Sequence, residues 1–287
     1  MKKQLCLNFC EILENILLNA PKVETVIQNA MELAGYTECE RIYVGSYFCS
    51  QYVLNTSMGL MKKLLDGANR MGIPVTLVLP MFTEKDISRG KEKIAEFIPY
   101  FQKEIDEITV NDYGMLEYIH QKFSLRINLG RLLFKDYRDP RYGEYYHQTS
   151  KPKYFSKQFL TICREYHINS LELDIPHERL DLSDAPEDIT ISVHIPYTYM
   201  TVGMVCEFAS IPYEISNKFR PNLPCNKDCL KNLLISNVIE DRTYIKIGRT
   251  VYFEHAEAQV DGTKGYREIF APIQLSYSSD DLEHCNK

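Results

Sequence analysis

The chain lacks a long hydrophobic run, an excess of positive charge and any stretch with the composition of a linker. Its longest apolar run, Val75–Phe82, is far shorter than the about 20 residues that a membrane helix needs. The net charge of −6 argues against an extended nucleic-acid interface, which needs a basic face, and leaves open only a local basic patch. No repeat or low-complexity tract divides the chain, so we expect one domain over 1–287 with a short polar C-terminal tail.

Two hydrolase motifs are also missing, the HExxH helix and the GxSxG nucleophile elbow. The nine cysteines are not spaced as densely as in a small disulfide-stapled protein. The first residues offer basic and apolar side chains, but Glu11 and Glu14 interrupt them and no small-residue cleavage site follows. We therefore expect a cytoplasmic protein whose thiols stay reduced and available to metal.

Strand-like and helix-like segments alternate along most of the chain. Seven strands are expected: Leu5–Phe9, Arg41–Ser46, Val75–Pro80, Ile108–Val110, Leu125–Leu129, Ser170–Ile175 and Ile189–Ile195. This alternation is typical of a parallel sheet with right-handed crossovers. The count favours an α/β fold, a (β/α) TIM-type barrel that is incomplete or irregular at its last unit. Two further strands are expected within Thr243–His255, around a Gly-Arg turn.

Three cysteines follow the seventh strand, in a segment that extends over 194–229. Cys206 comes first, and Cys225 and Cys229 follow it with three residues between them. Three thiols leave a tetrahedral metal or cluster site one ligand short. In a parallel barrel the loops after the strands all rise from one face, and the loop after the second strand carries Cys49. We therefore predict that these four cysteines form one ligand set.

Four thiolates can hold either zinc or an iron–sulfur cluster. Zinc knuckles usually have two residues between paired cysteines, so the three residues here favour a cluster slightly. A lone buried cysteine is most often a small hydrophobic residue. The remaining cysteines are Cys6 and Cys10 in or near the first strand, Cys39 on the opposite face, Cys163 in a helix and Cys285 in the tail.

Polar residues at strand ends are candidate catalytic residues. Asp112 follows the fourth strand and Arg131 the fifth, where a carboxylate can act as base or ligand; helix capping is the alternative for Asp112. His194 ends the seventh strand and could hydrogen-bond a cluster sulfur or donate a proton, with a packed core histidine as the alternative. The basic, tyrosine-rich segment 132–153 could bind a small anionic substrate, a nucleic-acid base or a partner.

Three motifs, in this order, resemble the collagenase-like peptidase family, U thirty-two. They are YVGSYFCS (43–50), VNDYG (110–114) and the later pair SVHIPYTYMTVGMVC and CNKDC. The chain is most similar to the short, single-domain UbiV-like group, the iron–sulfur accessory factors of anaerobic ubiquinone biosynthesis, over 40–229. The resemblance implies a [4Fe–4S] cluster on Cys49, Cys206, Cys225 and Cys229, a role in oxygen-independent hydroxylation, and a paralogous family member as hetero-oligomer partner.

The leading hypothesis is a [4Fe–4S]-binding barrel protein that acts as a subunit or accessory factor in oxygen-independent hydroxylation or a related redox modification. Two alternatives come from other classes of protein. One is a peptidase of the collagenase-like family, and the other is a non-catalytic binding module with a structural zinc. The sequence leaves the substrate and the oligomeric state open.

Overall fold

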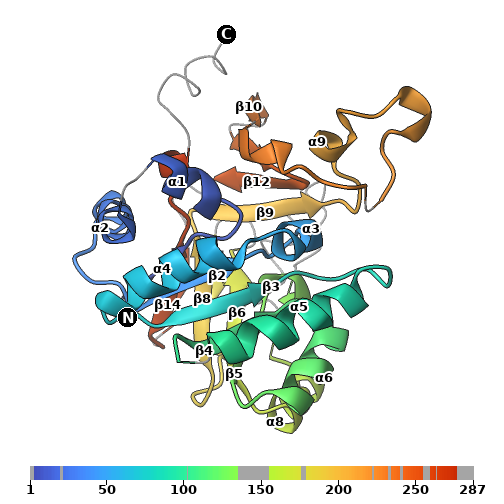
Figure 1. Ribbon diagram of the computed structural model, residues 1–287. Coiled ribbons are helices and arrows are strands. Elements are labelled where there is room, and N and C mark those ends of the chain that lie inside the picture. Colours follow the sequence, from blue (N-terminus) through green and yellow to red (C-terminus); the bar gives the residue numbers. More distant parts are fainter. Residues whose placement is uncertain are drawn as a thin grey trace.

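A closed parallel barrel lies at the centre of the computed structural model, which describes residues 3–19, 22–101, 103–134, 155–175, 179–221, 223–231, 234–239, 242–254, 259–262 and 264–276 (Figure 1). In sheet order its strands are β1 (Lys3–Asn8), β14 (Tyr266–Phe270), β8 (Thr190–Ile195), β6 (Ile168–Asp174), β5 (Arg126–Leu129), β4 (Ile105–Val110), β3 (Val75–Leu79) and β2 (Arg41–Gly45). The predicted α/β TIM-type barrel is therefore confirmed.

The strand that closes the barrel is β14, which was not among the predicted strands. It pairs in parallel with β8 on one side and with β1 on the other. Residues 196–265 separate β8 from β14, and they contain a second sheet rather than a single helix. The last unit of the barrel is thus irregular, and the cysteine segment belongs to this insertion.

Helices cover the outside of the barrel because each has one apolar stripe that packs on the strands. They are α2 (Val23–Ala34), α4 (Met58–Arg70), α5 (Ile87–Tyr100), α6 (Tyr113–Lys122) and α8 (Lys157–Glu165). Shorter helical segments are α1 (Leu13–Asn19), α3 (Ser50–Leu54), η1 (Arg131–Phe134) and η5 (Ile273–Ser276). None of the helices in the described part of the chain is long and apolar enough to cross a membrane.

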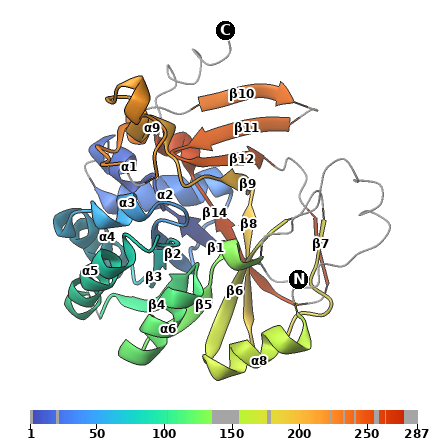
Figure 2. The ribbon, with the colours of Figure 1, turned by 90° about the vertical axis from the view of Figure 1, so that its right-hand side faces the viewer.

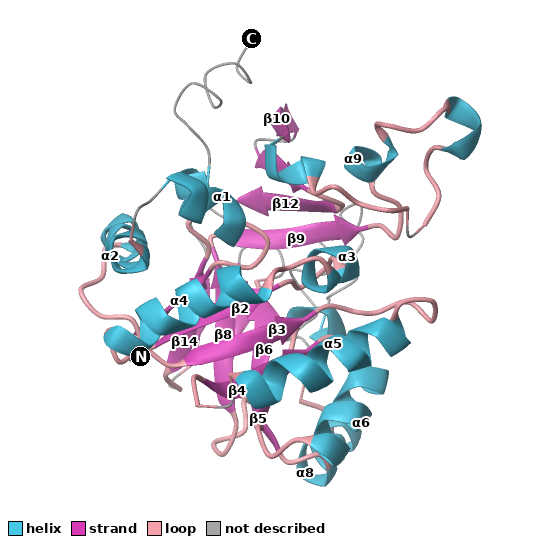
Figure 3. Cartoon of the chain, viewed as in Figure 1, coloured by secondary structure: helices cyan, strands magenta, loops and turns pink. Residues whose placement is uncertain are grey.

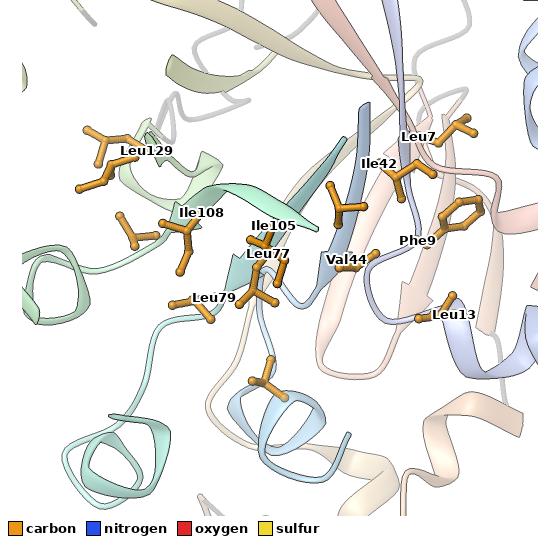
Figure 4. Close-up of a cluster of buried hydrophobic side chains, with 14 of the residues drawn as sticks. Leu7, Phe9, Leu13, Ile42, Val44, Leu77, Leu79, Ile105, Ile108 and Leu129 are labelled. Atoms are coloured by element: carbon orange, nitrogen blue, oxygen red, sulfur yellow. The ribbon is translucent and has the colours of Figure 1, made fainter. Parts of the chain in front are cut away.

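The two faces of the barrel strands differ in chemistry because successive side chains point to opposite sides. Figure 4 shows part of the apolar layer that faces the helices, including Ile42, Val44, Leu77 and Leu79. The alternate positions place polar side chains inside the barrel, where branched apolar residues are usual. These buried polar residues are Arg41, Thr76, Glu107, Thr109, Asn128, Ser170, Glu172, Ser192, His194 and Arg267.

Hydrogen bonds across the barrel join most of these polar side chains, although Arg41 Nε and Asn128 Oδ1 have no hydrogen-bond partner among the described residues. Arg267 Nη1 on β14 donates to Glu107 Oε2 on β4 at 3.2 Å, and Thr76 Oγ1 donates to Glu107 Oε1 at 2.8 Å. Thr109 Oγ1 donates to Glu172 Oε1 at 2.7 Å. Buried charges need such partners, since an unpaired one is costly, so the interior is specified by complementary polar pairs.

The insertion forms an antiparallel sheet across the mouth of the barrel at the carboxyl ends of its strands (Figure 2). Its strands are β10 (Leu234–Ile239), β11 (Arg242–Ile247), β12 (Thr250–Glu254) and β9 (Tyr197–Val202), in that order. Between β9 and β10 lie α9 (Glu207–Ser210), η3 (Ile215–Asn217) and η4 (Asp228–Lys231). A separate two-stranded ribbon joins β7 (Arg179–Asp181) to β13 (Gln259–Asp261). Figure 3 shows the inserted sheet above the barrel.

Aromatic side chains join the inserted sheet to the barrel. The ring of Phe48, in the loop after β2, lies 5.1 Å from that of Tyr199 on β9 and 5.8 Å from that of Tyr252 on β12. Tyr47 and Tyr197 belong to the same buried cluster. The inserted sheet therefore closes the mouth at which barrel enzymes usually bind their substrates.

Candidate functional site

Cys49, Cys206, Cys225 and Cys229 line one pocket between the mouth of the barrel and the inserted sheet. Cys49 comes from the loop after β2, Cys206 precedes α9, and the other two lie at or just before η4. The pocket measures about 710 Å³ with its open side included, and all four cysteines are free thiols. The fold thus brings together the four residues that the sequence predicts as one ligand set.

A tight turn after β2 positions Cys49. Gly45 has φ 119°, and a Cβ there would lie 2.2 Å from the carbonyl oxygen of Val78, so only glycine fits. Ser46 Oγ then accepts hydrogen bonds from the backbone N–H groups of Cys49 at 2.7 Å and Phe48 at 3.2 Å. These bonds fix the backbone that presents the Cys49 thiol to the pocket.

Glu11 supports the same turn from the end of β1. Its Oε1 accepts hydrogen bonds from Ser46 Oγ at 2.5 Å and from the Phe48 N–H at 3.1 Å, and its Oε2 accepts from the Tyr252 hydroxyl at 3.4 Å. Its backbone has φ 67°, which non-glycine residues rarely adopt. Burial raises the pKa of Glu11, and the bonds from Ser46 and Phe48 oppose that rise. Nothing in the sequence singles out this residue except that it closely follows the first strand.

The segment with Cys225 and Cys229 is attached to α1. Lys227 forms an ion pair with Glu14, and the Asn15 side chain donates to the carbonyl of Leu230. The Lys227 N–H also donates to Cys225 Sγ at 3.2 Å. Burial raises the pKa of Cys225, and this hydrogen bond to sulfur opposes the rise because it stabilises the thiolate.

The four pocket cysteines are half-buried, and burial affects the pKa values of three of them. Burial raises the pKa of Cys49 to about 11, while the charge of Arg249 opposes the rise. The pKa of Cys229 is raised by burial first and then by the charges of Cys49, Cys225 and Cys206. A bound positive centre would stabilise the thiolate forms that burial disfavours at these positions.

The four thiols line the pocket together with apolar and basic side chains. Within the described residues, no three His, Cys, Asp or Glu side chains form a group that could hold a metal ion.

Arg131 and His194, two of the predicted candidates, meet inside the barrel. Arg131 forms an ion pair with Asp174, and its Nε donates to Asp174 Oδ2 at 2.9 Å. Its Nη1 lies 3.2 Å from His194 Nδ1, and its Nη2 donates to the Tyr197 carbonyl at 3.0 Å. The other ring nitrogen, His194 Nε2, lies 2.8 Å from Glu172 Oε2. Both partners of this ring are therefore barrel residues, and neither is a cysteine.

The tautomer of His194 follows from these partners. A guanidinium can only donate, so Nδ1 accepts and Nε2 carries the proton that it donates to Glu172. Burial, followed by the charge of Arg131, lowers the pKa of His194 well below its usual value. Burial raises the pKa of Glu172 to about 8. A small cavity beside this network is lined by Arg131, His194 and Glu11, and Glu11 also lines the cysteine pocket.

Asp112 lies apart from these two groups and caps α6. Its Oδ1 accepts from the Met115 N–H at 2.7 Å and its Oδ2 from the Phe82 N–H at 3.3 Å. Helix capping, the alternative considered for Asp112, is therefore the role that these contacts show. Residues 135–153 of the basic, tyrosine-rich segment lie outside the described residues, as does Cys285.

The other described cysteines behave as buried or half-buried side chains. Cys6, Cys10 and Cys163 are buried, and Cys39 is half-buried with its Sγ donating to the Arg41 carbonyl at 3.2 Å. None of these four lines the cysteine pocket. The predicted division of the cysteines into one group at the mouth and several isolated residues agrees with this placement.

A barrel of this kind supports many unrelated activities, so the fold alone assigns none. The chemistry has to come from the four thiols and the groups around them. No protein-family model matches this chain, and the search of the curated proteins found no match.

Proposed function

We propose that Cys49, Cys206, Cys225 and Cys229 hold a [4Fe–4S] cluster. The observation that carries this proposal is that four free thiols, from segments far apart in the sequence, line one pocket. An all-sulfur donor set suits iron–sulfur clusters and zinc, and suits hard cations such as magnesium poorly. The raised pKa values of Cys49, Cys225 and Cys229 add support, because a positive centre would stabilise the thiolates that burial disfavours.

The spacing of the cysteines in the sequence favours a cluster over a lone zinc ion. Three residues separate Cys225 from Cys229, whereas zinc knuckles usually have two residues between paired cysteines. A structural zinc on the same four thiols is the alternative, and metal analysis distinguishes the two.

Four protein thiolates leave no open position for a substrate, and the aromatic cluster closes the mouth of the barrel. When bound, the cluster supplies one-electron redox chemistry. We therefore propose that the protein is an iron–sulfur subunit or accessory factor in oxygen-independent hydroxylation or a related redox modification. The family resemblance of the sequence motifs is the basis for the hydroxylation. A cytoplasmic location accords with this role because it keeps the thiols reduced.

A paralogous partner is part of this proposal. Ile211, Ile215 and Phe219 expose 60%, 87% and 61% of their surface, on the segment that continues to the pocket residues Arg220 and Leu223. Exposed apolar side chains that gather into one patch mark protein interaction sites. We expect the partner to contact this segment, which lies next to the thiols.

The test is anaerobic reconstitution with iron and sulfide, followed by the absorbance spectrum and by iron and sulfide analysis. We expect a brown protein with a broad visible band, which is lost in Cys49→Ala and in Cys225→Ala. Cys163→Ala is the matched control, because this buried thiol lies outside the pocket, and it should load like the wild type. A wild-type chain that stays colourless, or variants that load normally, would contradict the proposal.

A further inference from the structure

The turn formed by Gly248 and Arg249 lies against all three segments that carry the pocket cysteines. Arg249 lies in this turn between β11 and β12, and its Nε donates to the Phe48 carbonyl at 2.8 Å, with Nη2 donating to the same oxygen. Phe48 directly precedes Cys49. The side chain therefore ties the barrel's one pocket cysteine to the inserted sheet.

The backbone of the same turn reaches the other cysteines. The Arg249 carbonyl accepts from the Gly203 N–H at 3.2 Å, three residues before Cys206. The preceding residue, Gly248, lies beside Cys229, and a Cβ built there would be 3.9 Å from its Sγ. One turn thus sets the distance between cysteines from the barrel and cysteines from the insertion.

We propose that Arg249 is the positioning residue of the cysteine pocket. It holds the backbone before Cys49 against the inserted sheet, which closes the pocket, and it supplies positive charge that balances the thiolates. This inference rests on the proposed function, because the charge that it balances is that of a thiolate-bound cluster. Arg249 touches no substrate, and its effect is exerted through Cys49 and through its charge.

The surroundings of the guanidinium explain why arginine occupies this position. Arg249 is 9% exposed, and within the described residues it donates to one neutral carbonyl and forms no ion pair. A buried charge without a direct counter-ion is costly unless a negative group lies nearby. Four thiolates around an iron–sulfur core carry net negative charge, and the pocket that Arg249 lines contains all four.

The other polar atom of the Phe48 backbone is bound by the Glu11 carboxyl group. Glu11 accepts the Phe48 N–H while Arg249 donates to the Phe48 carbonyl, so the residue before Cys49 is fixed at both of its polar atoms. A lysine could keep the charge but has no planar fork with which to place two donors on one carbonyl. Arginine therefore serves positioning and charge together, and substitutions can separate the two.

The experiment compares Arg249→Met and Arg249→Lys with the wild type after anaerobic reconstitution. The readouts are iron per chain, the electron paramagnetic resonance spectrum and the midpoint potential of the cluster. We expect Arg249→Met to lose much of its iron, because the Cys49 ligand is no longer held in place. The cluster that remains should have a lower potential, because the reduced, more negative form loses a nearby positive charge. Arg249→Lys should keep the potential and lose part of the iron.

Arg126→Met is the matched control. Arg126 is an exposed arginine at the start of β5 that lies outside the cysteine pocket and pairs with Asp106. This variant should load iron like the wild type, which separates the contact with Phe48 from a general loss of positive charge.

The outcomes distinguish this inference from the function on which it rests. A wild-type chain that binds no cluster contradicts both. A wild-type chain that binds a cluster, together with an Arg249→Met variant of unchanged iron content, spectrum and potential, overturns the role of Arg249 alone. If circular dichroism shows that Arg249→Met does not fold, Arg249→Lys decides, and wild-type loading in that variant overturns the positioning role.

Discussion

The cysteine pocket and the polar network inside the barrel lie next to each other, and they differ in whether their polar groups have complementary partners. In the network, Arg131 faces Asp174 and His194, and His194 faces Glu172, so each group has a complementary partner. In the pocket, burial and then the charges of neighbouring thiols raise the pKa values of Cys225 and Cys229. The first arrangement is complete by itself, whereas a positive centre would stabilise the second.

This difference separates polar groups that stabilise the fold from polar groups that await a ligand. A satisfied network can define a unique core without any further role. A cluster of like groups without direct counter-ions is a candidate binding site. On this criterion we propose the thiols as the functional site and Arg131 and His194 as structural residues of the barrel.

Removal of one pocket thiol should have the largest effect and tests the difference between the pocket and the network most strongly. Cys225→Ala should abolish cluster binding, because three thiolates leave one iron without its protein ligand. The metal-free variant should differ from the metal-free wild type by about 1 kcal/mol or less, since a half-buried thiol contributes little to the core. Iron analysis and urea unfolding measure the two effects. A large loss of stability in the metal-free variant would show that this thiol is part of the core.

The opposite result is expected for the network. Asp174→Ala should destabilise the protein by about 3–5 kcal/mol, because it removes the ion-pair partner of the buried Arg131. Asp106→Ala is the control, since Asp106 pairs with Arg41 through a side chain that is 44% exposed, and such a pair contributes about 1 kcal/mol or less. Urea unfolding gives both values. Equal losses in the two variants would contradict the structural importance of the Arg131 network.

A third prediction concerns pH. The pKa of Glu172 is raised from 4.5 to about 8 in the folded protein, so ionisation favours the unfolded chain and stability is lost as the pH rises toward that value. His194 has its pKa lowered from 6.5, and its contribution is lost as the pH falls below that value. Between about pH 6.5 and 8, Glu172 should therefore dominate, with a loss of up to about 1.4 kcal/mol per pH unit.

Unfolding of the wild type and Glu172→Gln across this range measures the slope. The variant should lose less stability with rising pH than the wild type. Identical slopes in the two proteins would mean that Glu172 is ionised in the folded protein throughout the range.

The smallest effect is expected at Asp112. Asp112→Ala should cost about 1 kcal/mol through loss of the helix cap, while Asp112→Asn, which keeps an acceptor oxygen, should cost less. Neither change should alter the iron content. Thermal unfolding and iron analysis test this, and loss of the cluster in Asp112→Asn would place Asp112 in the functional site.

The barrel could be predicted because seven of its strands are short apolar runs that alternate with amphipathic helices. The eighth, β14, has the sequence YREIF, in which Arg267 and Glu268 interrupt the apolar pattern. Arg267 is nonetheless buried, because Glu107 across the barrel pairs with it. A strand whose inward positions are charged has no hydrophobic signature, and the pairing that stabilises it involves residues far away in the sequence.

The grouping of the cysteines could be predicted because it depends only on topology, which places the loops after β2 and β8 at one mouth. The residues that position these cysteines could not be predicted. Glu11 and Arg249 are single charged residues without a motif, and their roles arise from contacts with the Phe48 backbone. Contacts of this kind with the backbone cannot be recognised from residue type or spacing in a sequence.

The central claim is that the pocket holds an iron–sulfur cluster, and the most direct measurement is the iron, sulfide and zinc content of the protein purified without oxygen. The account predicts about four irons and four sulfides per chain and little zinc. A protein that contains about one zinc per chain, with no sulfide and no capacity to take up iron, would contradict it.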